Sequence, residues 1–547
     1  MPDTANIARH LPLMAELRPD GAAVKIPRGR TRKGEIDYLT LSFSELDAEA
    51  GLWQERLAKA GVARGDRTLV MVRPGLPLIA SVFALFATGA VPVVIDPGMG
   101  LGAFLACVAR TKPKAMVGIP LANLISRVAR NSFRGLSIRV SASGRLDARL
   151  GRKGDGSRGL SLAPTAADEL AAILFTSGST GAHKGVRYEH GMFEAQVGMI
   201  RRTYGIEPGE VDLPLLPVFA LFNPALGMTS VVPEIDPRRP AAVDPAKIVQ
   251  AITQEQVTNS FGSPTLWTRI GEHCIARGVM LPTLRRILCA GAPVPARLWD
   301  DASRFLPNGR MHSPYGATEA LPVSNAVQGE AKTGSLSGAD VGKPLDGMRV
   351  RIIAIDEGPC ARLSQTRELP RGEIGEIIVR GPVVTKAYDA LPEATAASKI
   401  ADDEDGVLWH RMGDTGFVDD EGGLWFCGRK AERVTPAEGA PLFTEPCERV
   451  FRTHPRARRC ALLGLGPQGR QIPALVVETR VETSSEAREL TRELRKLAQE
   501  HPDTERIQVY YYRERFPVDV RHNAKIHRLA LAKWAQTATG YRSEPKR

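Results

Sequence analysis

Cysteine is scarce in this sequence and forms no recognisable framework. The seven cysteines are scattered along 547 residues, are odd in number and never occur as Cys-x-x-Cys. This pattern argues against a set of disulfides and against a zinc site, and it favours a reducing compartment. Residues 1–20 also lack a sustained apolar stretch followed by a small-residue cleavage site. We therefore expect no secretory signal and a cytoplasmic protein.

The sequence also lacks an uninterrupted apolar run that could cross a membrane. The longest apolar stretch, Leu76 to Ile95, is broken by Gly89 and Pro92. We predict a helix over 78–88, a turn and a buried strand over 92–95, and no transmembrane segment.

The charge balance excludes little and identifies no partner. The chain is 43% apolar and 24% charged, which is typical of a globular protein, and it is too long for a single core. The net charge of +12 permits weak attraction to nucleic acid, anionic lipid or an acidic partner. Because a basic cluster such as 452–459 is most often a solvated face, we expect no nucleic-acid partner.

The order of expected helices and strands predicts an α/β protein with several subdomains. Residues 1–170 alternate helical stretches with short apolar strands, such as 68–72 and 115–117, which indicates parallel strands buried between helices. Residues 342–381 alternate like short antiparallel strands with glycine turns, which predicts a small β-barrel-like subdomain. From residue 435 the pattern predicts a compact α+β unit, in which Thr483 and Glu486 form a capping-box pair.

The stretch AAILFTSGSTGAHKGVR, residues 171–187, carries the clearest chemistry. The apolar run Ala171 to Phe175 predicts a buried strand that ends in a glycine-rich loop. Glycines let backbone N–H groups approach an anion, hydroxyls add donors and a lysine adds positive charge. The residues of this predicted phosphate loop are Thr176, Ser177, Gly178, Ser179, Thr180, Gly181 and Lys184. The order differs from the Walker pattern, and a plain polar linker is the alternative.

Three further segments follow the loop: 284–293, 313–319 and 413–429. Together with the loop they resemble, in the same order, the adenylate-forming superfamily of acyl-CoA synthetases, luciferases and the adenylation domains of peptide synthetases. The resemblance spans nearly the whole chain. It implies a ligase that uses ATP and Mg²⁺ to convert a carboxylic acid into an acyl-adenylate.

The resemblance assigns roles around the nucleotide base and sugar. It implies that Gly291, Ala292 and Pro293 lie against the adenine, where a flat purine needs a close backbone wall. Tyr315 would stack on the adenine, next to Gly316 in the nucleotide site. Asp414 would accept hydrogen bonds from both ribose hydroxyls, with Arg429 beside it.

It also assigns roles at the phosphates. Thr318 would contact a phosphate and Glu319 would bind magnesium, which prefers hard oxygen ligands. Lys525 would contact the reacting carboxylate and the α-phosphate. Lys525, Glu319, Thr318 and Lys184 are thus the predicted catalytic residues.

By the same resemblance, the chain divides into two domains joined by a hinge. Residues 1–428 would bind ATP and the acyl substrate, 429–434 would form the hinge, and 435–547 would form a small mobile domain.

Two departures from the superfamily pattern bear on the second half-reaction. The segment 214–223 contains no histidine, although Phe219 and Phe222 are in place to line an acyl channel or to pack in the core. The usual hinge residue is replaced by Ala431, and the segment 439–446, which normally helps to guide a thiol acceptor, carries two prolines. Both departures disfavour transfer to coenzyme A.

At 217–230, 315–324 and 521–528 the chain resembles most the branch of this superfamily that forms β-lactones in bacterial long-chain olefin biosynthesis. This implies a long-chain 2-alkyl-3-hydroxyalkanoic acid as substrate, whose own 3-hydroxyl attacks the adenylate. It also implies possible assembly with other enzymes of the pathway. The alternatives are a long-chain acyl-CoA or acyl-AMP ligase, and a basic scaffold protein that only retains the fold.

Overall fold

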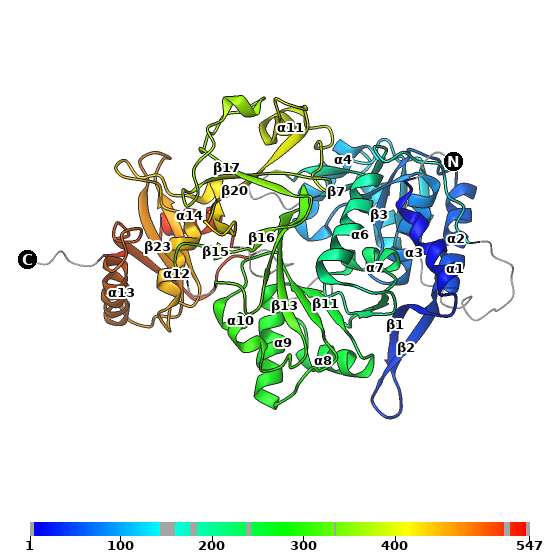
Figure 1. Cartoon of the computed structure of the whole chain (residues 1–547), viewed down its shortest axis with the longest axis horizontal. Coiled ribbons are helices and arrows are strands. Elements are labelled where there is room, and N and C mark those ends of the chain that lie inside the picture. The colour runs from blue at the N-terminus through cyan, green and yellow to red at the C-terminus, as the bar shows by residue number, and fades with distance from the viewer. Residues whose placement is uncertain are drawn as a thin grey trace, which may run out of the picture.

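The structure is a computed structural model that describes residues 5–142, 159–175, 183–236, 242–332, 335–518 and 526–542. In Figure 1 the N-terminal part lies at one end of the long axis and the C-terminal part, orange to red, at the other. Two large sheets and an antiparallel sheet form the body of the molecule, and a small sheet with three helices forms the C-terminal end.

The first sheet consists of α/β units, as the sequence predicts. In the described part of the chain its strand order is β6-β5-β3-β4-β7-β8, and all pairs are parallel except β7 with β8. The strands are β3 (Arg67–Met71), β4 (Val91–Val94), β5 (Ala115–Gly118), β6 (Ile138–Ser141), β7 (Leu170–Phe175) and β8 (Gly185–Glu189), and the helices between them are α3 (Leu76–Thr88), α4 (Leu101–Thr111) and α5 (Pro120–Val128). The predicted helix over 78–88 and strand over 92–95 are confirmed as α3 and β4.

The second sheet follows the order β16-β14-β13-β12-β11-β9-β10-β1-β2. Its six central strands, from β13 to β1, are parallel, so their carboxyl ends share one edge. The strands are β1 (Ala22–Arg30), β2 (Ile36–Ser42), β9 (Val211–Asp212), β10 (Thr229–Val231), β11 (Asn259–Gly262), β12 (Arg286–Cys289), β13 (Arg310–Ala317), β14 (Ala320–Val327) and β16 (Lys343–Pro344), and the helices beside β11 and β13 in Figure 1 are α8 (Pro245–Gln254), α9 (Pro264–Arg277) and α10 (Ala296–Ala302).

Helix α6 (His190–Tyr204) joins the two large sheets. It contacts β8 of the first sheet and β14 of the second, and it also contacts the short helix α7 (Asn223–Leu226). The remaining helices of this part are η1 (Ile7–Arg9), α1 (His10–Leu17), α2 (Phe43–Lys59), η2 (Pro97–Met99) and η4 (Pro217–Phe222). The space beneath α6 is therefore bounded by the second sheet, α7 and η4.

The predicted antiparallel strands over 342–381 are present, but their partners come from elsewhere. Strand β16 belongs to the second sheet, whereas β17 and β18 join strands that lie beyond residue 381. The third sheet contains β15 (Ala339–Asp340), β17 (Arg349–Ile353), β18 (Gly375–Arg380), β19 (Lys399–Ala401), β20 (Leu408–Val418) and β21 (Leu424–Arg429), with η6 (Leu363–Gln365), α11 (Pro392–Ser398) and η7 (Lys430–Glu432) beside it.

The C-terminal part is a compact α+β unit. Its sheet runs β22-β23-β24-β25 within the described residues, with β23 and β24 parallel. Its elements are α12 (Thr444–Arg452), β22 (Cys460–Leu465), β23 (Ile472–Glu478), α13 (Ser484–Gln499), β24 (Val509–Arg513), α14 (Arg528–Ala535) and β25 (Tyr541–Arg542). The exact domain limits 1–428, 429–434 and 435–547 stay a prediction.

The predicted capping box at α13 is half right. The Thr483 side chain accepts from the backbone N–H of Glu486, as expected. The Glu486 carboxylate, however, accepts from the backbone N–H of Glu482 at 2.8 Å and not from that of Thr483. The helix begins at Ser484 with Thr483 as its N-cap, as the pattern assumes, but the glutamate binds the backbone N–H one residue before the N-cap.

A buried ion pair stabilises the second sheet at its centre. Both nitrogens of the Arg286 guanidinium bind the Glu210 carboxylate, at 2.6 and 2.8 Å, and both side chains are less than 10% exposed. Removing one partner of such a pair leaves the other charge buried without compensation.

We therefore expect Arg286→Met to destabilise the protein by about 3–5 kcal/mol. Urea unfolding followed by tryptophan fluorescence measures this loss. The matched control is Arg304→Met, because the ion pair between Arg304 and Asp301 lies on the surface, and there we expect less than about 1 kcal/mol. A loss no larger than that of the control would contradict a stabilising role for the buried pair.

Candidate active site

Three predicted nucleotide-binding residues meet although they are far apart in the sequence. Tyr315 lies on β13, Asp414 on β20 and Arg429 at the end of β21. The Tyr315 hydroxyl donates to one oxygen of Asp414 at 2.7 Å, and Arg429 donates to the other oxygen at 2.7 Å. Burial raises the pKa of Asp414, and the charge of Arg429 opposes this rise. The arrangement fixes a carboxylate at the junction of the second and third sheets.

Thr318 and Glu319 form the two-residue turn between β13 and β14. The backbone oxygen of Thr318 accepts from the Tyr188 hydroxyl, and that of Glu319 accepts from the backbone N–H of Thr385 at 2.9 Å. A Cβ atom on Gly316 would lie 2.5 Å from the backbone oxygen of Ala320, so glycine allows the close approach of the two strands. The turn is thus held by bonds to its backbone, which leaves its side chains available.

The Glu319 side chain is oriented by Tyr388. The Tyr388 hydroxyl donates to Oε1 of Glu319 at 2.8 Å, and the ammonium of Lys184 lies 4.7 Å from the centre of the Tyr388 ring. Among the described residues, Oε2 of Glu319 accepts no hydrogen bond. A half-exposed carboxylate with one free oxygen fits a magnesium ion that takes its other ligands from phosphates and water.

A buried lysine lies behind this turn. Lys399 is 6% exposed and donates to the backbone oxygen of Thr385, the residue that binds the Glu319 backbone. Burial lowers the pKa of the Lys399 ammonium from 10.5 to about 7, and the charge of Glu319 opposes this shift. Burial also keeps the pKa of His410 well below its usual range, with Lys399 adding to the effect.

The other predicted nucleotide residues fall into two groups. Gly291, Ala292 and Pro293 lie in the loop after β12, at the same sheet edge as the end of β13, where Tyr315 lies. Thr176, Ser177, Gly178, Ser179, Thr180, Gly181 and Lys525 lie outside the described residues. The roles of both groups stay predictions.

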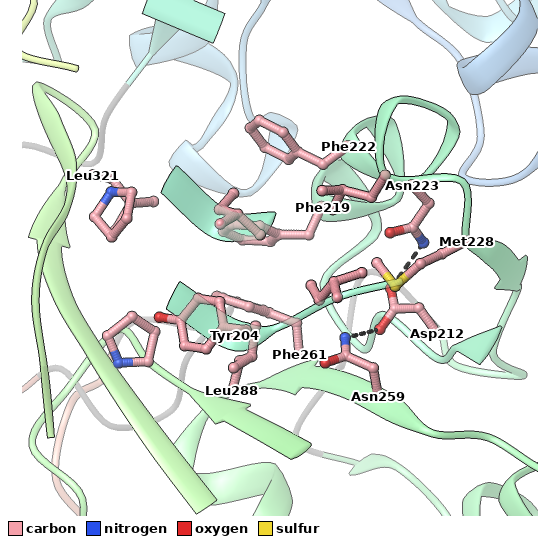
Figure 2. Close-up of a pocket in the computed structure, with 15 residues that line it drawn as sticks. Tyr204, Asp212, Phe219, Phe222, Asn223, Met228, Asn259, Phe261, Leu288 and Leu321 are labelled. Carbon is pink, nitrogen blue, oxygen red and sulfur yellow. Dashed lines mark hydrogen bonds between the residues drawn. The ribbon is translucent and has the colours of Figure 1, made fainter. Parts of the chain in front are cut away.

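An apolar pocket is lined by residues of α6, β11, β13 and β14 (Figure 2). Its empty space, including the mouth, is about 520 Å³. Phe219 and Phe222 lie on its wall, and the ring of Phe219 stacks on Phe261 with a centroid distance of 3.6 Å. Both phenylalanines also pack against the core. Their role in lining an acyl channel stays a prediction. The other lining residues are Ile200, Tyr204, Ile206, Asp212, Asn223, Leu226, Met228, Asn259, Leu288, Pro314, Leu321 and Pro322.

One end of the pocket is polar. Asp212 accepts from the amides of Asn223 and Asn259 at 2.8 and 2.6 Å, and Asn223 also donates to Ser230. Burial raises the pKa of Asp212 to about 6, and the two amides lower it. Sequence reasoning missed this group, as it missed Tyr388 and Lys399, because no local pattern distinguishes these residues.

Comparison with known proteins identifies the family. The description "AMP-binding enzyme" matches residues 15–389. The chain belongs to this family. It is 44% identical to proteins named olefin β-lactone synthetase from Xanthomonas campestris pv. campestris, over 98% of both chains, and from Stenotrophomonas maltophilia, over 97% of this chain and 98% of the other. The predicted superfamily is confirmed.

The fold is also similar to that of solved adenylate-forming enzymes. The crystal structure of ATP-bound MatB from Rhodopseudomonas palustris matches with a TM-score of 0.78 and 21% identity, over 98% of this chain and 99% of that one. The predicted α/β fold with a small C-terminal unit is therefore confirmed. No helix in the described ranges is long and apolar enough to span a membrane.

The buried Lys399 predicts a pH dependence of stability. Below about pH 7 the ammonium of Lys399 is charged in the folded chain as well, and its burial destabilises the protein by the full amount. Between about pH 7 and 10.5 the folded chain has lost this proton and the unfolded chain still holds it, so the destabilisation decreases as the pH rises. We expect Lys399→Met to gain stability over the parent at pH 6 and to lose that gain towards pH 10.

Thermal unfolding of the nucleotide-free protein at several pH values measures this difference. Lys533→Met is the control, because Lys533 is exposed on α14, and its difference from the parent should not vary with pH. A gain for Lys399→Met that grows with pH would contradict the assignment.

Proposed function

We propose that the chain adenylates a long-chain 2-alkyl-3-hydroxyalkanoic acid with ATP and that the 3-hydroxyl of the acid then closes a β-lactone, with release of diphosphate and AMP. The observation that carries this proposal is the 44% identity, over nearly the full length, to proteins named olefin β-lactone synthetase. The apolar pocket, whose lining includes Leu321 and Pro322, supports it, because a long alkyl chain needs an apolar surface.

In the first step, a carboxylate oxygen of the acid attacks the α-phosphorus of ATP and diphosphate leaves. Such transfers depend on positioning and on compensation of negative charge. Glu319 would hold Mg²⁺, which supplies positive charge to the phosphate oxygens, while Lys184 and Lys525 would add cations near the phosphates and the entering oxygen. Asp414 would accept from the ribose hydroxyls, fixed in place by Arg429.

In the second step, the oxygen of the 3-hydroxyl bonds to the acyl carbon and loses its proton to water, while the bond between the acyl carbon and the phosphate oxygen breaks and AMP leaves. The nucleophile belongs to the substrate, so no external thiol is needed. The missing histidine in 214–223 and the two prolines in 439–446 support this step, since both segments depart from the pattern that serves coenzyme A.

We also propose that the protein works in a reducing cytoplasm and assembles with other enzymes of the same pathway. All seven cysteines are free thiols in the structure, and six of them are buried, which suits a reducing compartment.

Product analysis by proton NMR tests the proposal. With pure enzyme, ATP, Mg²⁺ and a synthetic 2-alkyl-3-hydroxy acid, we expect a β-lactone and equal amounts of AMP and diphosphate without coenzyme A. A strict requirement for coenzyme A would instead identify an acyl-CoA ligase, and accumulation of acyl-AMP an acyl-AMP ligase. Absence of diphosphate release with every acid would contradict adenylation itself.

The same assay tests the predicted role of Lys525. We expect Lys525→Ala to slow diphosphate release by about 10²–10³-fold, because a cation at the developing charge is lost. Lys533→Ala removes an exposed lysine of the same domain and should leave the rate unchanged. Equal rates for the two variants would contradict the role of Lys525.

A further inference from the structure

The closed end of the apolar pocket consists of three buried polar side chains. Asp212 ends β9, Asn223 begins α7 and Asn259 begins β11, and each is 2% exposed. Figure 2 shows them together at the end of the pocket opposite Leu321. We call these three residues the polar floor.

The floor lies inside the second sheet, away from the edge at which the parallel strands end. Asn259 and Phe261 are two residues apart on β11, and both line the pocket. The strand pairings place Asn259 level with Arg286 of β12 and Arg310 of β13, eight residues before Thr318. Eight residues of a parallel strand span roughly 26 Å, so the floor lies far from the Thr318–Glu319 turn.

The polar groups of the floor bind one another and are hardly exposed to the pocket. Asp212 already accepts from both amides, and in Figure 2 the amide oxygen of Asn259 points away from Asp212. That oxygen is buried and has no hydrogen-bond partner among the described residues. Because each floor residue is only 2% exposed and Asp212 is already bonded to both amides, an alkyl terminus that reaches the floor meets packed atoms and no open space.

The floor is also held rigidly. Asn223 is bound to Ser230 on β10, and Thr258, next to Asn259, binds the Glu210 carboxylate that forms the ion pair with Arg286. These bonds fix three neighbouring strands and α7, so the floor cannot recede easily for a longer chain.

We propose that Asp212, Asn223 and Asn259 set the length of the alkyl arm that the pocket accepts. This inference rests on the proposed function, in which the pocket receives an alkyl arm of the acid. An arm long enough to reach the floor would clash with these packed side chains.

The location of Asp212 excludes a second role that its chemistry would suit. A carboxyl group with a raised pKa could take the proton of the 3-hydroxyl. That hydroxyl, however, is attached two carbons from the carboxyl group, which reacts at the sheet edge. The floor lies too far from this edge to reach it, so its contact is with the end of the alkyl arm.

Two variants at this end of the pocket, one of the floor residue Asn259 and one of the neighbouring lining residue Leu226, should shift chain-length preference in opposite directions. Asn259→Ala removes the unpaired oxygen and opens space, while Asp212 keeps the amide of Asn223, so the preferred arm should lengthen by about two carbons. Leu226→Phe adds volume one helical turn from Asn223 and should shorten it. Asn308→Ala, on an exposed loop, is the matched control and should leave the profile unchanged.

The measurement is kcat/KM for diphosphate release with two series of 2-alkyl-3-hydroxy acids. In one series the 2-alkyl branch varies from about 4 to 14 carbons, and in the other the main chain varies over the same range. For one of the two arms, the ratio between acids two carbons apart should change by about tenfold in each of these two variants. Thermal unfolding shows whether each variant is folded. If Asn259→Ala does not fold, the same measurements are made on Asn259→Ser and Leu226→Phe.

Unchanged profiles for both arms in the folded variants would overturn the inference, and so would an equal loss of rate at every chain length. Neither result affects the proposed function, which fails only if the parent enzyme releases no diphosphate with these acids or forms no lactone.

Discussion

The site depends on one two-residue turn, Thr318–Glu319, that several distant parts of the chain hold in place. Tyr188 on β8 of the first sheet binds the backbone of Thr318, and Thr385 in the segment after β18 binds the backbone of Glu319. Tyr388 in the same segment binds the Glu319 carboxylate. The turn itself belongs to the second sheet, so it lies where elements of three sheets meet. A shift of any sheet would move Glu319 relative to the predicted nucleotide site.

The same junction explains why polar groups are buried around it. Lys399 supports Thr385 from behind, and Asp414 is held between Tyr315 and Arg429 at the neighbouring contact of the second and third sheets. Burying such groups is unfavourable unless each has a partner. The hydrogen bonds that compensate this burial also hold the side chains in fixed positions. A reaction that depends on the alignment of two substrates requires such fixed positions.

The sequence predicts the parts of this site that have local signatures. Tyr-Gly-Ala-Thr-Glu and Asp-Thr-Gly make Tyr315 to Glu319 and Asp414 candidates for the site, and they indicate the family, which the comparison confirms. The segments 217–230, 315–324 and 521–528 indicate the β-lactone branch, in agreement with the relatives found. The helix α3 and the strand β4 follow from apolar runs broken by glycine and proline.

Residues whose role comes from long-range contacts could not be predicted in this way. Tyr388 acts on Glu319 across 69 residues, and Asn259 reaches Asp212 across 47. The residues next to them in the sequence form no motif that indicates a functional site. The capping box at Thr483 fails for a related reason, because the path of the chain before the helix decides which N–H the glutamate meets.

The most direct test of this account is the magnesium dependence of acid-dependent exchange of labelled diphosphate into ATP, compared between the parent and Tyr388→Phe. If Tyr388 orients Glu319 for the metal, the half-saturating Mg²⁺ concentration should rise about tenfold or more, with the fold retained. Tyr541→Phe, at the edge of the C-terminal sheet, should behave like the parent. An unchanged Mg²⁺ requirement in folded Tyr388→Phe would contradict the account.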